Sequence, residues 1–460
     1  MSELQVRLRM GAYFFVQYFM LGVWFVSLGT YMSKSLGFDS VIGWAYAAQG
    51  VAALIASPFA GAIADRWVGA RSLLTILMAI SAVSLFGLSM VRESEVLFLA
   101  LVLIHFLAFV PTIPLTNAVC LNGLIDPERQ FARIRVFGTL GWIAGGMVIG
   151  AIPGALLTPL PIQLASAAGI LLAIGAYVLP ELAATARPEP LNLVRALGLD
   201  AISRIRNRSF WAVCSCAAIL SLPLAFYNAY CNNFLQESGA VVTVLGRTFE
   251  PTAIQALGQV SELGFLLALP LFLRLVGIGG VLVIGTIGWI LRAAFFATGY
   301  SGIGDASLVP LLAGILLHGV CYDFIMIGAA LFVDRAVDPA ARSRAQSFLT
   351  MITMGAGISI GSILANPLYN AATISDNAHD WSLMWASVGG VAIIALVIFL
   401  EQRAAYRLRS PKAARLLSTR NHPPRHAIRD SFREPQHPGA TIVPARSCHL
   451  ISTAVSPTAC

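Results

Sequence analysis

The amino-acid sequence predicts an all-α membrane protein whose twelve transmembrane helices form two bundles of six. Three observations support this prediction. Of the 460 residues, 57% are hydrophobic and only 11% are charged, whereas a soluble globular domain carries about 25% charged residues. Apolar runs of spanning length recur along the chain as far as about residue 401, and one long polar stretch divides them into two equal sets.

The apolar runs define the individual helices, because ~20 mostly apolar residues are needed to cross the hydrocarbon core of a bilayer. The first run lacks a small-residue cleavage site, so we interpret it as a helix and not as a cleaved signal peptide. The predicted spans are residues 11–32, 41–64, 71–91, 95–118, 136–154, 161–182, 209–232, 253–275, 278–298, 307–332, 344–370 and 381–401.

The basic residues predict the orientation of these spans. When the loops are assigned alternately to the two sides, one side contains only Lys34, Arg92 and Arg247. Basic residues accumulate on the cytoplasmic side, so both termini are expected there. The net charge of +8 then reflects the topology in a bilayer, and no nucleic-acid partner is expected. The cytoplasmic set is Arg7, Arg9, Arg66, Arg71, Arg129, Arg133, Arg135, Arg187, Arg195, Arg204, Arg206, Arg208, Arg274, Arg335, Arg342 and Arg344.

The polar stretch sets the expected domain boundaries. Residues 183–208 are the longest polar interruption in the helical part, and we interpret them as a cytoplasmic linker. An N-terminal six-helix bundle, residues 1–182, precedes the linker, and a C-terminal bundle, residues 209–403, follows it. Residues 404–460 are rich in arginine and proline without apolar periodicity, a composition typical of a disordered tail, which we expect in the cytoplasm.

The sequence gives no sign of catalytic or metal chemistry. None of the seven cysteines has metal-ligand spacing, and Cys214 and Cys216, which are two residues apart, do not share a helix face. Neither a His-Glu-x-x-His motif nor a Gly-x-Ser-x-Gly motif is present. We therefore expect no enzyme, no metal site and no cofactor.

Four ionisable residues are the clearest functional candidates in or at the predicted spans. Glu262, Arg292 and Asp323 fall within the eighth, ninth and tenth spans, and Arg135 lies at the start of the fifth. Ionisable groups inside a membrane are costly unless they face a cavity or a partner, so each is a functional candidate. The alternative for the two carboxyl groups is a static ion pair with Arg135 or Arg292, and the role of Arg292 stays open between a salt bridge and function.

Two histidines in the spans are weaker candidates. A neutral imidazole is satisfied by a hydrogen bond to a backbone carbonyl, so we favour a structural role for both His105 and His318.

Polar side chains accompany the two carboxyl groups. Gln259 lies three residues before Glu262, so the two share one face of a helix, and Tyr322 directly precedes Asp323. Asn228, which shares a face with Asn232 four residues on, supplies a second polar surface. Such a set suits a flat, polar, uncharged solute. A carboxyl group in this setting can take up a proton on one side and release it on the other, as proton coupling requires.

The segment GAIADRWVGAR, from Gly61 to Arg71, joins the second and third spans. Its glycines allow two helices to approach closely, and Asp65, Arg66 and Arg71 can hold a cytoplasmic contact between them. We interpret it as a gating motif. A counterpart that matches the motif only in part, LRLVGIGG at residues 273–280, follows the eighth span, as expected of an internally repeated transporter.

This gating motif resembles the loop motif of the major facilitator superfamily. Further stretches resemble the nucleoside:proton symporter family within it, and the similarity runs in order through nearly all of residues 10–400. The stretches are RIRVFGTLGW at 133–142, PLAFYNAY at 223–230, GQVSE at 258–262 and HGVCYDF at 318–324.

The resemblance implies a major-facilitator-type fold in the bacterial inner membrane and import of nucleosides with protons. Glu262 and Asp323 would couple transport to the proton, with Arg135 tuning their protonation, and the chain would act as a monomer. The positions that match the family's substrate-binding residues are Arg135, Thr139, Asn228, Gln259, Glu262, Tyr322 and Asp323.

Two positions depart from the family pattern. Ala225 stands where better-known members carry glutamine, and Tyr322 stands where they carry phenylalanine. A site that loses a hydrogen-bonding amide loses discrimination between solutes. The preferred nucleoside therefore stays open, and a sugar or another small polar solute is the alternative cargo.

Overall fold

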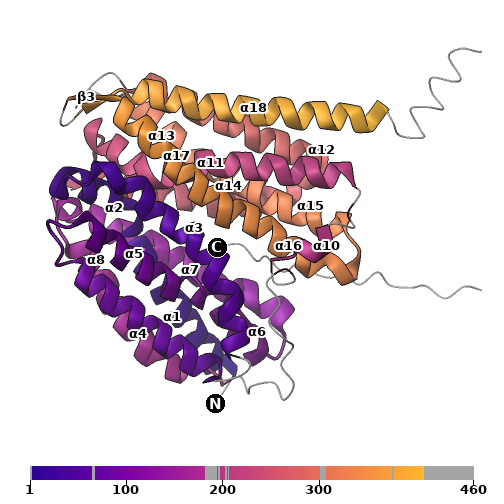
Figure 1. The fold of residues 1–460 in the computed structure, drawn as a ribbon, viewed down its shortest axis with the longest axis horizontal. Coiled ribbons are helices and arrows are strands. Elements are labelled where there is room, and N and C mark those ends of the chain that lie inside the picture. The colour runs from indigo at the N-terminus through magenta and orange to yellow at the C-terminus, as the bar shows by residue number, and fades with distance from the viewer. Residues whose placement is uncertain are drawn as a thin grey trace, which may run out of the picture.

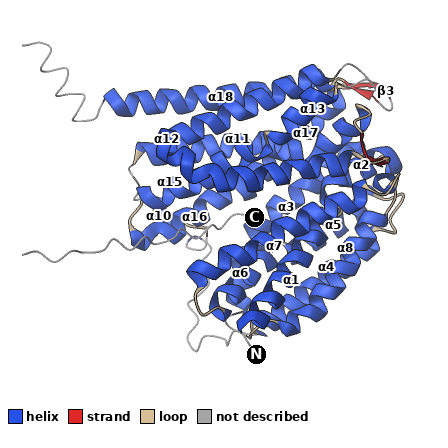
Figure 2. Ribbon diagram, turned by 180° about the vertical axis from the view of Figure 1, so that it is seen from behind, coloured by secondary structure: helices blue, strands red, loops and turns tan. Residues whose placement is uncertain are grey.

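The computed structural model describes residues 3–64, 68–181, 194, 197–202, 205, 207–300, 307–375 and 378–408. Nearly all of this chain is helical (Figure 2). In the first part of the chain the helices are α1 (Glu3–Gly22), α2 (Leu28–Tyr31), α3 (Ile42–Ile63), α4 (Ala70–Leu88), α5 (Glu95–Phe109), α6 (Thr112–Gly123), α7 (Pro127–Gly150) and α8 (Leu160–Gly175).

The second part of the chain contains helices and two short hairpins. The antiparallel hairpins pair β1 (Val242–Val244) with β2 (Arg247–Phe249) and β3 (Thr373–Ser375) with β4 (Ala378–His379). The helices are α10 (Leu199–Ile202), α11 (Arg208–Glu237), α12 (Pro251–Gly299), α13 (Leu308–Leu316), α14 (His318–Tyr322), α15 (Gly328–Ala336), α16 (Arg342–Thr350), α17 (Ile358–Ala371) and α18 (Trp381–Leu408).

The described residues contain eleven helical segments that are long and apolar enough to cross a membrane. The 49-residue α12 accounts for the difference from the predicted twelve. At ~1.5 Å per residue a straight helix of this length would far exceed the ~30 Å hydrocarbon core. Gly277, with φ 68° and ψ 171°, leaves the helical region and divides α12 into two arms, which correspond to the predicted eighth and ninth spans. Glycine adopts this positive φ without the steric cost of a Cβ atom.

The start of the fifth span differs from the prediction. Helix α7 begins at Pro127 and not near residue 136, because a proline is well suited to the first turn of a helix. Arg135 therefore lies about two turns inside α7, whereas the sequence predicted it at the start of the span.

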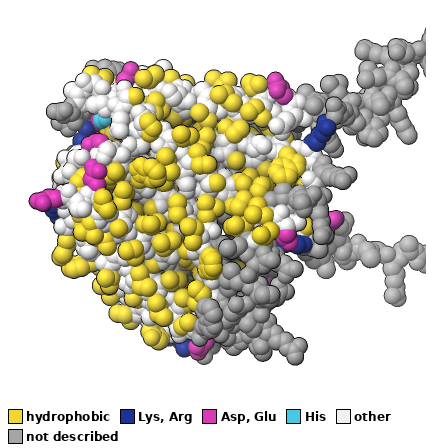
Figure 3. Space-filling model, viewed as in Figure 1, with side chains coloured by type: hydrophobic (Ala, Val, Ile, Leu, Met, Phe, Trp, Pro, Cys, Tyr) yellow, Lys and Arg dark blue, Asp and Glu magenta, His cyan; other side chains and the backbone are white. Residues whose placement is uncertain are grey.

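The surface of the helical body is apolar. Figure 3 shows hydrophobic side chains over most of the visible face, with charged side chains near its edges. Large apolar residues point outward on the predicted spans, as in Val83 of α4 (72% exposed), Val96 of α5 (79%) and Leu267 of α12 (76%). Because a soluble protein rarely exposes apolar surface on this scale, the face is one that contacts lipid.

The helices form two halves that converge at one end (Figure 1). In that view α2 and β3 lie at the converging end, whereas α6 and α16 lie apart near the other end. The converging end carries Lys34 and Arg247, two of the basic residues predicted to lie outside the cytoplasm, and we call it the outer end. Close approach there depends on glycine: a Cβ on Gly29 would lie 2.3 Å from the carbonyl oxygen of Ala229, in the opposite half.

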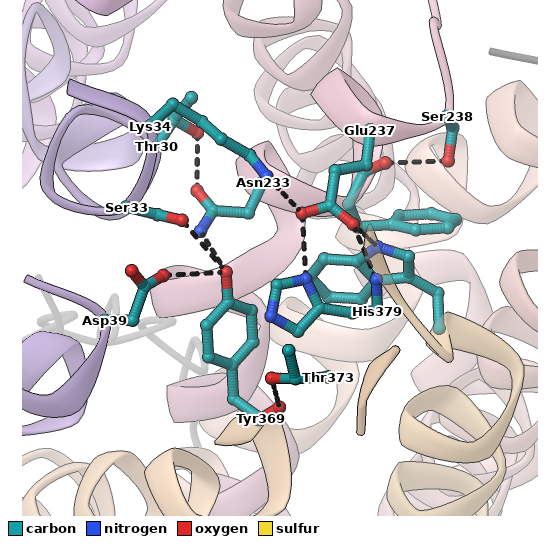
Figure 4. A network of polar contacts seen from close by, with 12 residues as sticks. Thr30, Ser33, Lys34, Asp39, Asn233, Glu237, Ser238, Tyr369, Thr373 and His379 are labelled. Carbon is teal, nitrogen blue, oxygen red and sulfur yellow. Dashed lines mark hydrogen bonds and ion pairs between the residues drawn. The ribbon is translucent and has the colours of Figure 1, made fainter. Parts of the chain in front are cut away.

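A polar network joins the two halves at the outer end (Figure 4). Lys34 follows α2 and donates to Glu237 of α11 at 2.7 Å. Glu237 also accepts from the Trp381 side chain (2.6 Å) and from the backbone and ring of His379 (3.1 and 2.9 Å). Three donors of the second half thus fix the carboxylate, and Lys34 is the contact that it makes with the first half.

Candidate functional site

The first half contributes Arg135 and Thr139 from α7. The Arg135 guanidinium donates to the hydroxyl group of Tyr18 on α1 and lies 4.2 Å from the centre of that ring. Gly138 permits this arrangement, since a Cβ there would lie 2.7 Å from a guanidinium nitrogen. Thr139 is four residues beyond Arg135 and therefore on the same helix face. Both residues are half-buried. Tyr18 was not among the predicted site residues.

The close packing of α1 on α7 positions this arginine. A Cβ on Gly141 would lie 2.0 Å from the carbonyl oxygen of Phe15, and one on Gly145 would lie 2.7 Å from the backbone nitrogen of Val23. Small residues spaced four apart allow membrane helices to approach to backbone contact. The glycines of α7 therefore hold Tyr18 against Arg135.

The first arm of α12 contributes Gln259 and Glu262. The Gln259 amide nitrogen lies 3.1 Å from His318 Nε2, and Glu262 Oε2 lies 3.7 Å from the same atom. Both side chains are half-buried and face α14. The one-face arrangement expected from their spacing is present, and the group that they both face is His318.

His318 occupies the centre of this cluster, although a structural role was expected for it. Its ring is buried and stacks on Tyr227 and Tyr322, with ring centres 5.1 and 5.9 Å away. Its Nδ1 lies 3.2 Å from a guanidinium nitrogen of Arg292. The four-residue spacing between His318 and Tyr322, which places both on one helix face, is the sequence signal that could have identified it.

His105, the second histidine of the spans, lies elsewhere. It is buried on α5, where Nδ1 lies 2.9 Å from the hydroxyl group of Ser81 and the ring packs against Trp24. These contacts fit the structural role that was expected for it.

Asp323 is fully buried, and neither of its carboxyl oxygens has a hydrogen-bond partner within the described residues. It begins a π-helical segment, Asp323–Ile327, and such segments occur frequently at functional sites. Electrostatically, Glu262 acts on Asp323, and Arg135 of the opposite half acts on Glu262. The structure thus places Glu262 within electrostatic range of both Asp323 and Arg135.

The expected alternative, a static ion pair, is absent in this conformation. Among the described residues, no nitrogen of Arg135 or Arg292 lies within 4 Å of a carboxyl oxygen of Glu262 or Asp323. Neither carboxyl group therefore forms an ion pair with Arg135 or Arg292 in this conformation.

The asparagines of α11 separate into two roles. The single hydroxyl proton of Thr30, in the first half, is shared between Asn232 and Asn233, whose Oδ1 atoms lie 2.8 and 2.6 Å from the Thr30 oxygen. Both asparagines therefore belong to the contact between the halves. Asn228 lies one turn before Asn232 and is half-buried. Ala225 is fully buried, and its methyl group would lie 2.8 Å from a Cβ on Gly361, so this position serves the packing of α11 on α17.

The gating motif is only partly visible. Gly61 lies in α3, whereas Asp65 and Arg66 lie outside the described residues. Arg71, at the start of α4, pairs with Glu181 at 2.9 Å. This ion pair joins two segments of the first half.

Comparison with known proteins places the chain in a family. A family model described as nucleoside H+ symporter matches residues 4–406. The chain belongs to the nucleoside:proton symporter family. The resemblance inferred from the sequence motifs is thereby confirmed, and the chain is a multi-pass membrane protein of a transporter family.

Relatives match nearly their full length. Xanthosine permease of Escherichia coli is 31% identical over 406 residues, which cover 86% of this chain and 95% of the permease. Nucleoside permease NupG of Escherichia coli is 28% identical over 423 residues, which cover 90% of this chain and all of NupG. A crystal structure of the nucleoside transporter NupG superimposes with a TM-score of 0.76 at 27% identity, covering 86% of this chain and 98% of that one. The predicted major-facilitator-type fold is confirmed.

Proposed function

We infer that this chain is a symporter that imports nucleosides together with protons by alternating access of its two halves. The observation that carries the inference is the family match over residues 4–406. The site agrees with it, because Asp323 is a buried carboxyl group that has no hydrogen-bond partner among the described residues and lies within electrostatic range of Glu262. Internally repeated transporters bind their cargo at such a midplane position between the halves.

We propose that both halves contact the nucleoside. Arg135 and Thr139 approach it from α7, Gln259 and Glu262 from α12, and Asn228 from α11. Tyr322 and Asp323 complete the site, and Tyr322 offers the face of a ring to the nucleobase. This division of the site is supported by the half-buried position of these side chains, Asp323 excepted, which leaves them accessible to a solute.

The proposed coupling uses Asp323 and Glu262. A proton on either carboxyl group removes a charge from the span and lowers the cost of moving the halves around it. Arg135 acts on Glu262 from the other half, so its distance changes as the halves rock, and with it the ease of protonation. The proton thus binds on one side of the membrane and leaves on the other.

The conformation in hand suits release to the cytoplasm. The halves meet at the outer end through Lys34–Glu237 and the Thr30 contacts. With both termini cytoplasmic, as the basic residues predict, this conformation has its outer gate closed. We propose a monomer in the bacterial inner membrane that needs no cofactor beyond the coupling proton.

Uptake into proteoliposomes tests the proposal. Radiolabelled uridine and adenosine are offered with and without an inwardly directed proton gradient. We expect gradient-driven accumulation in the wild type and its loss, by at least ~10-fold, in Asp323→Asn, which keeps the shape of the side chain but cannot carry the proton. Counterflow of nucleoside without a gradient should persist in this variant. Uptake indifferent to both the gradient and the substitution would contradict proton coupling.

Ala225 is the reason to test a second class of cargo, a sugar or another small polar solute. The methyl group cannot supply the amide that better-known members have at this position, so recognition of one polar group of the cargo is absent here. A thermal-shift screen over nucleosides and sugars separates the two candidates, because a bound ligand stabilises the folded state. Stabilisation by a sugar and by no nucleoside would favour the alternative.

A further inference from the structure

Arg292 and His318 form a buried pair that the coupling scheme above does not use. Arg292 is fully buried on the second arm of α12, with its guanidinium carbon 3.7 Å from the centre of the Tyr227 ring. Within the described residues no carboxyl oxygen lies within 4 Å of it. Aromatic faces offset part of the cost of burying a cation. The contact with His318 Nδ1 at 3.2 Å supplies a charge-assisted hydrogen bond.

The direction of this hydrogen bond is fixed by chemistry. A guanidinium group has only donors and does not lose its proton in proteins. His318 Nδ1 must therefore accept, which leaves the imidazole neutral and places its single proton on Nε2. Arg292 thus selects the tautomer of His318.

The selected tautomer has a consequence for Gln259 and Glu262. His318 Nε2–H is a donor, and the atoms that it faces are the Gln259 amide nitrogen at 3.1 Å and Glu262 Oε2 at 3.7 Å. Two donors cannot form a hydrogen bond, so we assign the Gln259 amide the other way round, with its oxygen at this position. The oxygen and nitrogen of an amide side chain are distinguished by their partners. An amide beside a donor presents its oxygen, so the NH2 group of Gln259 turns away from His318 and toward the solute.

We propose that Arg292 is a positioning residue that acts through His318 and makes Gln259 a hydrogen-bond donor to the cargo. The group of the cargo that contacts Gln259 must then be a hydrogen-bond acceptor. This rests on the proposed function, in which Gln259 contacts a nucleoside. The acceptor is a carbonyl oxygen or an unprotonated ring nitrogen of the base, or a sugar oxygen. A donor-only group, such as an exocyclic amine, is rejected at this position.

Other titratable groups surround the pair. Tyr227 and Cys231 of α11, and Cys321 and Tyr322 of α14, lie near Arg292 or His318. None of these is an acid that holds a charge at neutral pH, since thiols and phenols are neutral there. The carboxyl group of Glu262 approaches His318 from the Nε2 side.

The tautomer is tested without any cargo. Nitrogen-15 NMR of histidine-labelled protein distinguishes protonated from unprotonated ring nitrogens, and His318→Asn identifies the His318 signals by their loss. We expect Nε2 protonated and Nδ1 unprotonated in the wild type, and a mixture of tautomers in Arg292→Met. A proton on Nδ1 in the wild type, or an unchanged spectrum in Arg292→Met, would overturn the proposal whether or not the protein carries nucleosides.

Transport then tests the effect on specificity. His318→Asn keeps an acceptor near Arg292 but removes the Nε2 donor, and Arg292→Met removes the guanidinium while keeping a long buried chain. Each should raise KM about tenfold with a smaller change in maximal rate, because each disorders Gln259. The KM of the double variant should rise by no more than about tenfold, since both substitutions break the same chain of hydrogen bonds.

His105→Asn is the matched control, because it removes a buried histidine of similar environment far from the cluster. It should keep the wild-type KM, and melting temperatures should show that all variants fold. In a series of uridine analogues that each lack one carbonyl oxygen, one analogue should bind the wild type and Gln259→Glu equally well, because it lacks the oxygen that Gln259 contacts. Additive losses in the double variant, or a wild-type KM in folded Arg292→Met, would refute the positioning role.

Discussion

At the scale of single residues, the site is defined by how each charge is compensated. Arg135 has a hydroxyl group and an aromatic face from Tyr18, Arg292 has an imidazole and aromatic faces, and Asp323 has no hydrogen-bond partner in the described structure. An uncompensated charge in a span is the most costly of the three. Asp323 is therefore the group whose charge state is most strongly linked to its surroundings, as a proton carrier requires.

Tyr18 offers a direct test of how Arg135 is held. Tyr18→Phe removes the hydroxyl acceptor of Arg135 but keeps the ring 4.2 Å from the guanidinium. Hydrogen bonds to charged groups contribute ~1.5–3 kcal/mol, so KM for nucleoside uptake should rise by roughly tenfold or more. Tyr18→Ala, which also removes the ring, should raise KM further.

The control for this pair lies on the same helix. The Tyr13 hydroxyl group is buried without a hydrogen-bond partner among the described residues. Tyr13→Phe should therefore leave KM unchanged and keep or raise the melting temperature. Equal uptake by Tyr18→Phe and Tyr13→Phe would show that the Tyr18 hydroxyl does not position Arg135.

At the scale of elements, backbone contacts between α1 and α7 set the position of the site. A Cβ on Gly141 would lie 2.0 Å from a backbone oxygen of α1, which no side-chain adjustment relieves. Gly141→Ala should therefore lower stability by ~1–3 kcal/mol, as overpacking does, and reduce uptake. Gly264→Ala in α12, where a Cβ would meet nothing within 4 Å, should be neutral or slightly stabilising. Melting curves in detergent compare the two, and similar curves would contradict the packing argument.

The elements were predictable from the sequence to different degrees. The spans were predicted because the length of an apolar run is dictated by the thickness of the bilayer. The start of α7 was not, because its first turns contain the polar residues Glu128, Arg129 and Gln130, which lie outside the apolar run although the helix already begins at Pro127. The merging of two spans into α12 was also missed, because Gly277 turns the chain without a polar loop.

Site residues were predictable where an ionisable side chain is costly to place in lipid. They were less predictable where the role of a residue depends on the side chain that it contacts. Glu262 and Asp323 stand out in any apolar run. His318 does not, because a neutral histidine is inexpensive, and only its contacts with Gln259 and Arg292 place it at the centre. Asn232 was assigned to a polar surface from its spacing, but its partner Thr30 lies 202 residues away in the chain. No local pattern contains that contact.

At the scale of the whole molecule, the two halves form a two-state device whose balance depends on the outer contact. Glu237 is held within the second half by His379 and Trp381, so it stays in place when the halves separate, and Lys34 is the partner that leaves. The pair is shielded, since the Lys34 and Glu237 side chains are only 14% and 2% exposed. Removing one member of such a pair leaves a buried, uncompensated charge, which is strongly destabilising for the closed arrangement.

Lys34→Met should therefore shift the population of the protein toward the state with its outer end open. Spin labels placed on the two halves at the outer end should report longer distances by double electron–electron resonance. The exchange of Lys34 and Glu237 should not restore closure, because a lysine at position 237 cannot accept from the Trp381 and His379 donors. Arg247→Met, which removes an exposed basic residue from the same end, should leave the distances unchanged. Closure that survives Lys34→Met would show that the other contacts between the halves hold the outer end shut without the ion pair, such as those of Thr30 with Asn232 and Asn233 and of Tyr369 with Ser33.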